Sequence, residues 1–254
     1  MDFNALHHQN QPLLIANVWD ASSAMAASRL GYPALGTSSA AIAAMLGYDD
    51  GEAMPFDMLL MMVSRIRAVT TLPLSVDLEA GYSDAAEGII GNIQRLLSHG
   101  VVGINLEDSR VVAGERRLEE ASHFARTLTV LHAAFPDLFI NVRTDTFLLD
   151  VEQPLAETLR RGKMYAACGA QGLFVPGVTG QEEITTLARE VALPLNVMSM
   201  PELADFSTLA TWGVRRISMG NSVHSALQTT LNALLSGIRS TQTFSGVYRH
   251  ADHG

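Results

Sequence analysis

Short apolar runs rich in β-branched residues alternate along the chain with longer stretches of helical periodicity. The apolar runs lie at residues 13–17, 33–38, 72–78, 101–107, 137–143, 171–176, 193–198 and 214–220. The helical patterns lie at residues 21–30, 55–70, 84–98, 118–134, 152–168, 180–190, 201–211 and 222–239. Strands that alternate with helices in this way predict a parallel sheet with right-handed crossovers.

Eight strand–helix units within 254 residues predict a (β/α)₈ TIM barrel. A doubly wound sheet is the alternative, but it usually carries a glycine-rich phosphate-binding turn after its first strand. The segment that follows the first run, LLIANVWDASS, contains no glycine. No linker or low-complexity run divides the chain, so we expect one barrel domain over residues 1–254, with 241–254 as a tail.

Composition narrows the classes of function. The net charge is −9 and no Lys/Arg cluster is longer than a pair, which argues against a nucleic-acid partner. The single cysteine, Cys168, excludes an intrachain disulfide. No apolar stretch reaches the roughly 18 residues of a membrane helix, and no signal peptide is recognisable. We therefore expect a soluble, cytoplasmic protein without a membrane partner.

Charged residues gather where the third, fourth and fifth apolar runs end. Asp77 and Glu79 follow the third run, Glu107 and Asp108 the fourth, and Arg143 the fifth. The carboxyl ends of parallel barrel strands form one rim, which is where barrel enzymes keep their chemistry. Asp77 and Glu79 are two residues apart and would point the same way on a strand.

Acids that converge on one rim repel each other unless a cation neutralises them. Asp50, in the segment after the second run, adds a further carboxylate. Oxygen ligands without neighbouring His or Cys favour Mg²⁺, or Mn²⁺, over zinc. Any one acid could instead cap a helix or pair with Arg, but their convergence favours a metal. Arg143 could grip a carboxylate or phosphate, or only form a salt bridge that orders the rim.

Two segments, 39–54 and 108–117, are long for tight turns and are candidate lids over this rim. Ser38 and its neighbours Ser39 and Ala40 could cradle an anion, although Ser38 could equally cap a helix. Lys163, the only lysine, lies within a helical pattern, which argues against a Schiff-base aldolase.

The chain resembles the isocitrate lyase/phosphoenolpyruvate mutase superfamily. The matching segments are NVWDASSA, GTSSAAIAAMLGYDDG, LPLSVDLEAGY, GINLEDS, NVRTD and LFVPG, in the family's order over about residues 12–240. The resemblance implies a TIM barrel whose last helix is exchanged between subunits of a homo-dimer or homo-tetramer. It also implies Mg²⁺-dependent chemistry on C–C or P–C bonds next to an α-keto acid.

The resemblance also implies roles for individual residues. The metal would be bound directly by Asp77, with its water ligands held by Glu79, Glu107 and Asp50. The substrate's carboxylate would be bound by Ser38 and by the backbone of Ser39 and Ala40, close to Asp77. Arg143 would face the leaving or transferring group, and we count Arg143 and Glu107 among the catalytic residues.

The chain departs from the family in the segment after the fourth run. Isocitrate and methylisocitrate lyases carry Lys-Lys-Cys-Gly-His there, and the mutases and phosphonopyruvate hydrolases carry a Lys-Thr-Asn type of segment. Here the segment reads SRVVAGERRLEE, and Glu79 replaces the usual Asp. Isocitrate lyase activity is therefore not expected, and Glu115 or Arg116 becomes the candidate catalytic group of the lid.

We predict a Mg²⁺-dependent lyase that forms or cleaves a C–C bond next to an α-keto acid through a pyruvate-type enolate. Its substrate would be a small 2-keto or 2-hydroxy di-acid, and decarboxylation of the oxaloacetate type is included. One alternative is a phosphonate enzyme, either a phosphoenolpyruvate or carboxyphosphonoenolpyruvate phosphonomutase or a phosphonopyruvate hydrolase. Another is a non-catalytic protein that binds keto acids.

Overall fold

The computed structural model describes residues 2–248. The chain divides into two compact units, one up to Gly220 and one from Asn221, and each is described by itself. The second unit holds α9 (Ser222–Thr241) and α10 (Ser245–Tyr248). Within the described residues no helix is both long enough and apolar enough to cross a membrane.

The first unit is a nearly closed barrel of parallel strands. The strands are β1 (Leu13–Leu14), β2 (Ala16–Val18), β3 (Leu35–Thr37), β4 (Leu74–Asp77), β5 (Gly103–Glu107), β8 (Phe139–Arg143), β9 (Gly172–Phe174), β10 (Leu195–Met198) and β11 (Val214–Ser218). Their order in the sheet is β1-β11-β10-β9-β8-β5-β4-β3-β2, and every pairing is parallel. The predicted (β/α)₈ barrel is confirmed.

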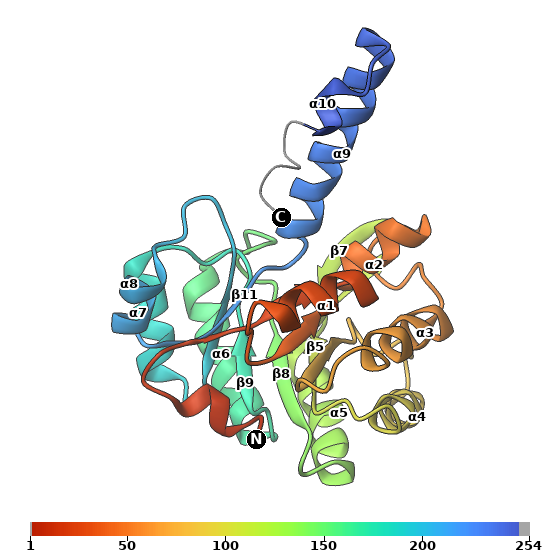
Figure 1. The fold of residues 1–254 in the computed structure, drawn as a ribbon. Coiled ribbons are helices and arrows are strands. Elements are labelled where there is room, and N and C mark those ends of the chain that lie inside the picture. The colour runs from red at the N-terminus through yellow and green to blue at the C-terminus, as the bar shows by residue number, and fades with distance from the viewer. Residues whose placement is uncertain (1, 249–254) are drawn as a thin grey trace. The chain divides into compact units, whose positions relative to one another are not determined.

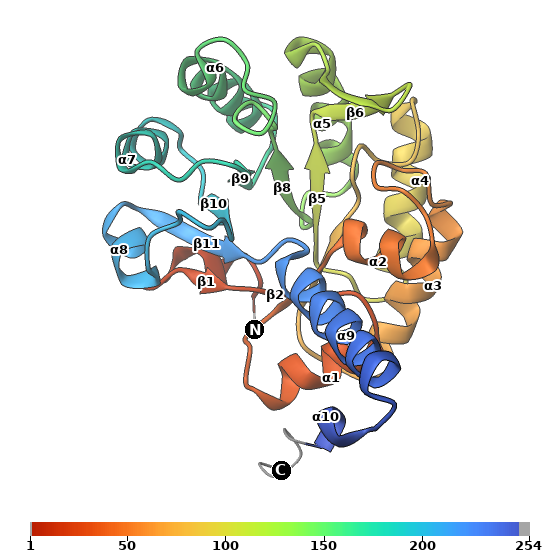
Figure 2. The ribbon, with the colours of Figure 1, turned by 90° about the horizontal axis from the view of Figure 1, so that it is seen from above.

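The sheet closes because β1 and β2 are two halves of one apolar run. The first half pairs with β11 and the second half with β3. At the junction, the amide of Ile15 donates to the carbonyl of Ile217 at 3.0 Å. The next amide, that of Ala16, donates to the carbonyl of Ala34 at 3.3 Å. Figure 2 looks onto the resulting ring of strands.

Helices lie around this ring (Figure 2). They are η1 (Ala5–His8), α1 (Ala21–Arg29), α2 (Ser39–Leu46), α3 (Phe56–Arg67), α4 (Ala86–Leu97), α5 (Ala121–Ala134), α6 (Pro154–Ala167), α7 (Gln181–Glu190) and α8 (Phe206–Thr211). Of these, η1 lies at the amino end of the ring and α2 at its carboxyl end (Figure 1, Figure 2). The spacing of apolar residues sets which face is buried. In α4, for example, Ile89, Ile93 and Leu96 recur every three or four residues and are all buried.

Both segments expected as long loops contain regular structure. Residues 39–46 form α2, which Ser38 caps at its start and Gly47, with φ of 81°, at its end. Residues 109–118 form an antiparallel hairpin of β6 (Ser109–Val112) and β7 (Glu115–Leu118). Its two turn residues, Ala113 and Gly114, both have positive φ, as in the two-residue turns that suit the twist of a hairpin.

The barrel interior is polar, in contrast with the Val, Ile and Leu layers that dominate most TIM barrels. Asn141 donates to Asn105 Oδ1 at 2.9 Å and to Asn196 Oδ1 at 3.0 Å. Asn196 donates in turn to Ser218 Oγ at 3.1 Å, and Arg216 Nη2 donates to Asn105 Oδ1 at 3.3 Å. These hydrogen bonds tie strands β5, β8, β10 and β11 together from inside, although Asn141 Oδ1 and Arg216 Nε and Nη1 have no hydrogen-bond partner among the described residues.

Asp108 fastens the barrel to α6 instead of facing the rim. Its carboxylate is fully buried and accepts from Arg161 Nη1 at 2.8 Å, Tyr165 Oη at 2.7 Å and Thr144 Oγ1 at 2.9 Å. Arg161 also donates to the carbonyl of Glu119 at 3.0 Å, just after the hairpin. This network fixes the base of the hairpin against the helix.

Loss of Arg161 should destabilise the protein strongly, because Asp108 would remain as an uncompensated buried charge. We expect Arg161→Met to lower the free energy of unfolding by about 3–5 kcal/mol. The control is Arg160→Met on the same helix, whose half-exposed side chain pairs with Glu157 alone among residues 2–248 and should cost less than about 1 kcal/mol. Urea denaturation of both variants measures the difference, and equal losses would contradict this role.

Candidate active site

Asp77 ends β4 and is bonded to the start of α2. Its Oδ2 accepts from Ser39 Oγ at 2.7 Å, and its Oδ1 lies 3.5 Å from Asn105 Nδ2. Its backbone amide donates to Thr37 Oγ1 at 2.8 Å. The end of β3, the end of β4 and the first turn of α2 therefore meet at this carboxylate.

Ser38 and Ser39 are buried at the start of α2. Ser38 Oγ accepts from the amide of Ala41 at 3.3 Å, so Ser38 is the N-cap of this helix. The amides of the first helical turn, including that of Ala40, point out of the helix start and favour negative charge there. The capping role and the predicted carboxylate-binding role thus fall on the same few residues.

Glu79 lies in the tight turn after β4 with φ of 51°. Its buried carboxylate accepts from Tyr82 Oη at 2.8 Å and from the amide of Glu52 at 2.8 Å. Burial, together with the negative charges of Asp77 and Glu107, raises the pKa of Glu79 to about 8. The acids of β4 and β5 are therefore close enough to repel one another.

Glu107 ends β5 between two arginines. Its Oε1 accepts from Arg116 Nη1, and its Oε2 lies 3.1 Å from Arg143 Nη1. Burial raises the pKa of Glu107, while Arg143 lowers it. Arg143 also forms a bidentate pair with Asp145, at 2.7 Å from Nε and 3.0 Å from Nη2. Arg143 therefore forms the salt bridge that was the alternative to binding an anion, and it does so with the guanidinium edge that carries Nε.

The β6–β7 hairpin sends one of its residues into this group. Side chains alternate along β7, so Arg116 points toward the rim and its neighbours point away. Arg116 is 15% exposed, and its Nη2 lies 3.2 Å from Asp50 Oδ2. Glu115 is 69% exposed and pairs with Arg117. The structure thus brings Arg116 and Asp50 to the predicted acids and leaves Glu115 outside.

The residues present fit a hard cation held largely through water. Within residues 2–248 no three His, Cys, Asp or Glu side chains are placed to surround a metal ion directly. One direct ligand, with further acids that hold water ligands, does not need such a triad. The donors are carboxylate oxygens that repel one another, and buried Glu107 Oε2 has an ion-pair contact with Arg143 but no hydrogen-bond partner among the described residues. Mg²⁺ prefers oxygen donors and keeps several waters.

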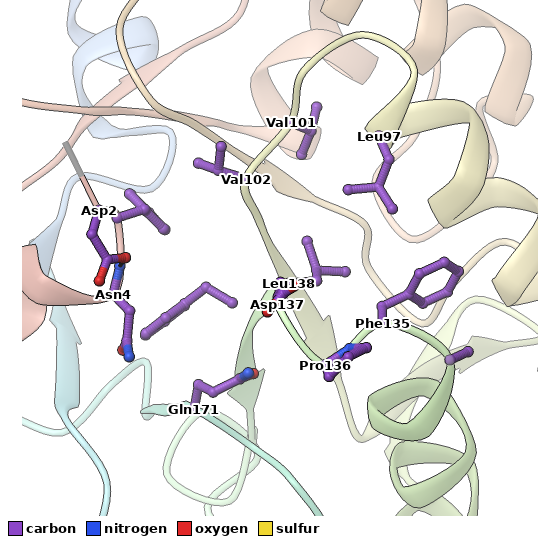
Figure 3. A pocket seen from close by; sticks show the side chains of 13 residues that line it. Asp2, Asn4, Leu97, Val101, Val102, Phe135, Pro136, Asp137, Leu138 and Gln171 are labelled. Atoms are coloured by element: carbon purple, nitrogen blue, oxygen red, sulfur yellow. Dashed lines mark hydrogen bonds between the residues drawn. The ribbon is translucent and has the colours of Figure 1, made fainter.

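Cavities lie on both faces of the barrel. A cavity of about 290 Å³ adjoins the rim, between Glu79 and Glu107 on one side and Val111 of the hairpin on another. A larger one, of about 770 Å³, lies near the amino ends of β5 and β8 and is lined by Leu138 and Gln171 among others (Figure 3). Barrel enzymes carry their chemistry at the carboxyl ends, so only the smaller cavity adjoins the candidate site.

Comparison with known proteins assigns the family. The family described as phosphoenolpyruvate phosphomutase matches residues 3–239. The chain belongs to this family. It is 31% identical over 226 residues to the uncharacterized protein Rv1998c of Mycobacterium tuberculosis, a match that covers 89% of this chain and 84% of the relative. It is 28% identical over 257 residues to an oxaloacetate decarboxylase of Bradyrhizobium, covering 93% and 88% of the two chains.

Solved structures give the same picture. A Burkholderia cenocepacia protein provisionally termed a phosphonomutase is 39% identical, with a TM-score of 0.86, and the match covers 92% of this chain and 97% of that one. Two structures at 18% identity share the fold, both with a TM-score of 0.85. One is oxaloacetate acetylhydrolase with 3,3-difluorooxalacetate, covering 96% and 87% of the two chains. The other is phosphonopyruvate hydrolase with oxalate and Mg²⁺, covering 99% and 89%.

These comparisons confirm the predicted superfamily and an enzyme of its lyase and mutase type. They do not test the individual site residues, whose roles stay predictions. Sequence reasoning left Asp145 out of the site and placed Ser39 there by its backbone alone. The signal for Asp145 was its position two residues after Arg143, on the same side of an extended chain.

The raised pKa of Glu79 predicts a pH dependence of stability in the metal-free protein. A carboxyl group whose folded pKa lies above its unfolded value stabilises the fold below about pH 4.5, and this contribution is lost as the pH rises through about 8. We expect stability to fall across that window, by at most about 1.4 kcal/mol per pH unit from this group. Glu79→Gln should flatten the fall when unfolding is followed in EDTA from pH 5 to 9. An unchanged slope in that variant would contradict the assignment.

Proposed function

We propose that this protein is a Mg²⁺-dependent lyase that cleaves or forms a C–C bond next to an α-keto acid through a pyruvate-type enolate. The observation that carries the proposal is the meeting of Asp77 with the start of α2, beside the mutually repelling Glu79 and Glu107. Asp77 would bind the metal directly, and Glu79, Glu107 and Asp50 would hold its waters.

The residues of the chain supply binding, orientation and charge. The first turn of α2, from Ser38 to Ala40, would hold the substrate's carboxylate, since amides at a helix start favour anions. When bound, the metal would supply Lewis-acid stabilisation of the enolate oxygen. Arg143 stays charged, because Glu107 and Asp145 raise its pKa, and it adds positive potential where negative charge develops.

The proposed substrate is a small 2-keto or 2-hydroxy di-acid. Relatives between 26% and 29% identical that cover most of this chain are named oxaloacetate decarboxylase. For such a substrate, the bond between the carboxyl carbon and the carbon next to the keto group breaks. In oxaloacetate its electron pair becomes the enolate of pyruvate and CO₂ leaves, after which that carbon takes a proton from solvent water to give pyruvate. The segment without Lys, Cys or His after β5 supports this class over isocitrate cleavage.

Phosphonate chemistry is the second candidate. The solved protein provisionally termed a phosphonomutase is 39% identical, which favours P–C bond chemistry at the same rim. The two candidates share the enolate and the metal, and they differ in the group that leaves.

Binding of oxalate, which mimics the pyruvate enolate, tests the proposal. We expect calorimetry to show tight binding that requires Mg²⁺ and that Asp77→Ala reduces by at least about a hundredfold, since the variant loses the direct ligand. The control is Asp57→Ala, an exposed acid on α3 that should leave binding unchanged. A panel of oxaloacetate, 2-methylmalate and phosphonopyruvate then identifies the bond that breaks.

Several outcomes would contradict or redirect the proposal. Oxalate binding that does not depend on Mg²⁺ or on Asp77 would contradict it. Turnover of phosphonopyruvate alone would select the phosphonate candidate. Tight binding without turnover of any compound would favour a keto-acid-binding protein.

We also propose that α9 is exchanged between subunits of a homo-dimer or homo-tetramer. A stripe of its apolar side chains is 44–56% exposed, at Val223, Leu227, Leu231 and Leu235. These residues recur every four positions and so lie on one face of the helix. Such a face is costly in water, and a second copy of the chain would cover it.

Disruption of this stripe should dissociate the oligomer. We expect Leu227→Asp/Leu231→Asp to lower the mass measured by light scattering to that of one chain. Thr230→Asp/Asn232→Asp, which changes exposed polar residues of the same helix, should leave the mass unchanged. An unaltered mass in the leucine variant, or a monomeric wild-type protein, would contradict the exchange.

A further inference from the structure

Arg116 differs from the other arginines near the rim in how its donors are used. Arg143 donates from Nε and Nη2 to the carboxylate of Asp145. Arg110 donates from Nε to Glu119 and from Nη2 to two backbone carbonyls. Arg161 likewise has partners at Nε, Nη1 and Nη2. In all three the guanidinium is fixed by the protein itself.

Arg116 uses only the end of its guanidinium. Its Nη1 contacts Glu107, Ser109 Oγ at 3.1 Å and Asp145 at 3.5 Å, and its Nη2 contacts Asp50 at 3.2 Å. Its Nε has no hydrogen-bond or ion-pair partner among residues 2–248. The edge formed by Nε and Nη2 is one of the two that bind a carboxylate in bidentate fashion, and here it is open at Nε.

The hairpin holds this side chain in place. Register pairs Val111 with Arg116, so the two-residue turn sets which β7 side chains face the rim. The network of Asp108 and Arg161 anchors the base of the same hairpin. The guanidinium is thus a part-buried cation on a fixed arm, aligned by Glu107 and Asp50 at its end.

We propose that Arg116 determines specificity for di-acids, by binding the second carboxylate of the substrate through its open edge. This inference rests on the proposed function, because it assumes that the keto-acid end of the substrate is held at Asp77 and α2. A two-carbon acid would fill that end alone, and a four-carbon di-acid would also reach the arginine. The hairpin then replaces, with one Arg, the Lys- and Cys-bearing lids of other members of the superfamily.

Two probes separate this role from a structural one. Oxalate occupies only the enolate end, where its two carboxylates mimic the carboxylate and the enolate oxygen, and 3,3-difluorooxaloacetate adds a second, distal carboxylate beyond that end. With Mg²⁺ present, we expect Arg116→Ala to weaken difluorooxaloacetate about ten- to a hundredfold in calorimetry and to leave oxalate within about threefold. Arg116→Lys should recover part of the loss, because it keeps the charge but not the fork. Arg117→Ala, the exposed neighbour, is the control and should change neither affinity.

Three other outcomes of these measurements would contradict the inference. Equal weakening of both probes by Arg116→Ala would overturn the inference, since Arg116 would then act only by holding Glu107 and Asp50. Wild-type protein that binds oxalate but gains nothing from the second carboxylate would also overturn it and would leave the proposed function standing. Wild-type protein that does not bind oxalate with Mg²⁺ would overturn the proposed function itself, and the inference with it.

Discussion

Repulsion between carboxylates at the ends of β4 and β5 is the constraint around which this rim is built. Parallel strands deliver Asp77 and Glu107 to adjacent places, and the turn after β4 adds Glu79. Burial makes the like charges of these groups energetically costly. A proton on a carboxylate or a neighbouring cation reduces that cost. The arginines of β7 and β8 meet Glu107 from two sides. Among the described residues, Glu79 accepts hydrogen bonds from a hydroxyl and an amide and pairs with no cation, and burial raises its pKa.

Two kinds of positive charge could neutralise these acids, a proton or a bound divalent cation. A proton on Glu79 would lower the repulsion among these acids. With a divalent cation bound, as proposed, the same acids would serve as metal ligands or hold its waters, and the charge that burial disfavours would favour the metal. The polar interior of Asn105, Asn141 and Asn196 lies below this rim on the same strands and fixes their relative positions.

Much of this fold was predictable because its signals are local. The eight apolar runs coincide with the barrel strands, and polar residues at their ends marked Asp77, Glu107 and Arg143 correctly as rim residues. The orientation of β7 was not predictable, since a one-residue change of turn would exchange Glu115 for Arg116 at the rim. The turn residues Ala113 and Gly114 set that register, and a single sequence does not reveal it.

The polar interior had a signal that the apolar pattern concealed. Asn is followed by an aliphatic residue in four strands, as Asn17-Val18, Asn105-Leu106, Asn141-Val142 and Asn196-Val197. Such a repeat places Asn inward and the aliphatic residue against the helices. The sequence carries no comparable signal for the division after Gly220. The spacing of apolar residues in α9 is that of an ordinary barrel helix, and only their exposure in the structure distinguishes it.

Proton release on metal binding tests the central claim most directly. If burial and its acidic neighbours keep Glu79 protonated in the metal-free protein, Mg²⁺ must displace that proton as it binds. Calorimetric titration at pH 7 in buffers of different ionisation enthalpy should show about one proton released per Mg²⁺, falling toward zero at pH 9 and in Glu79→Gln. Mg²⁺ binding without proton release at pH 7 would contradict the account.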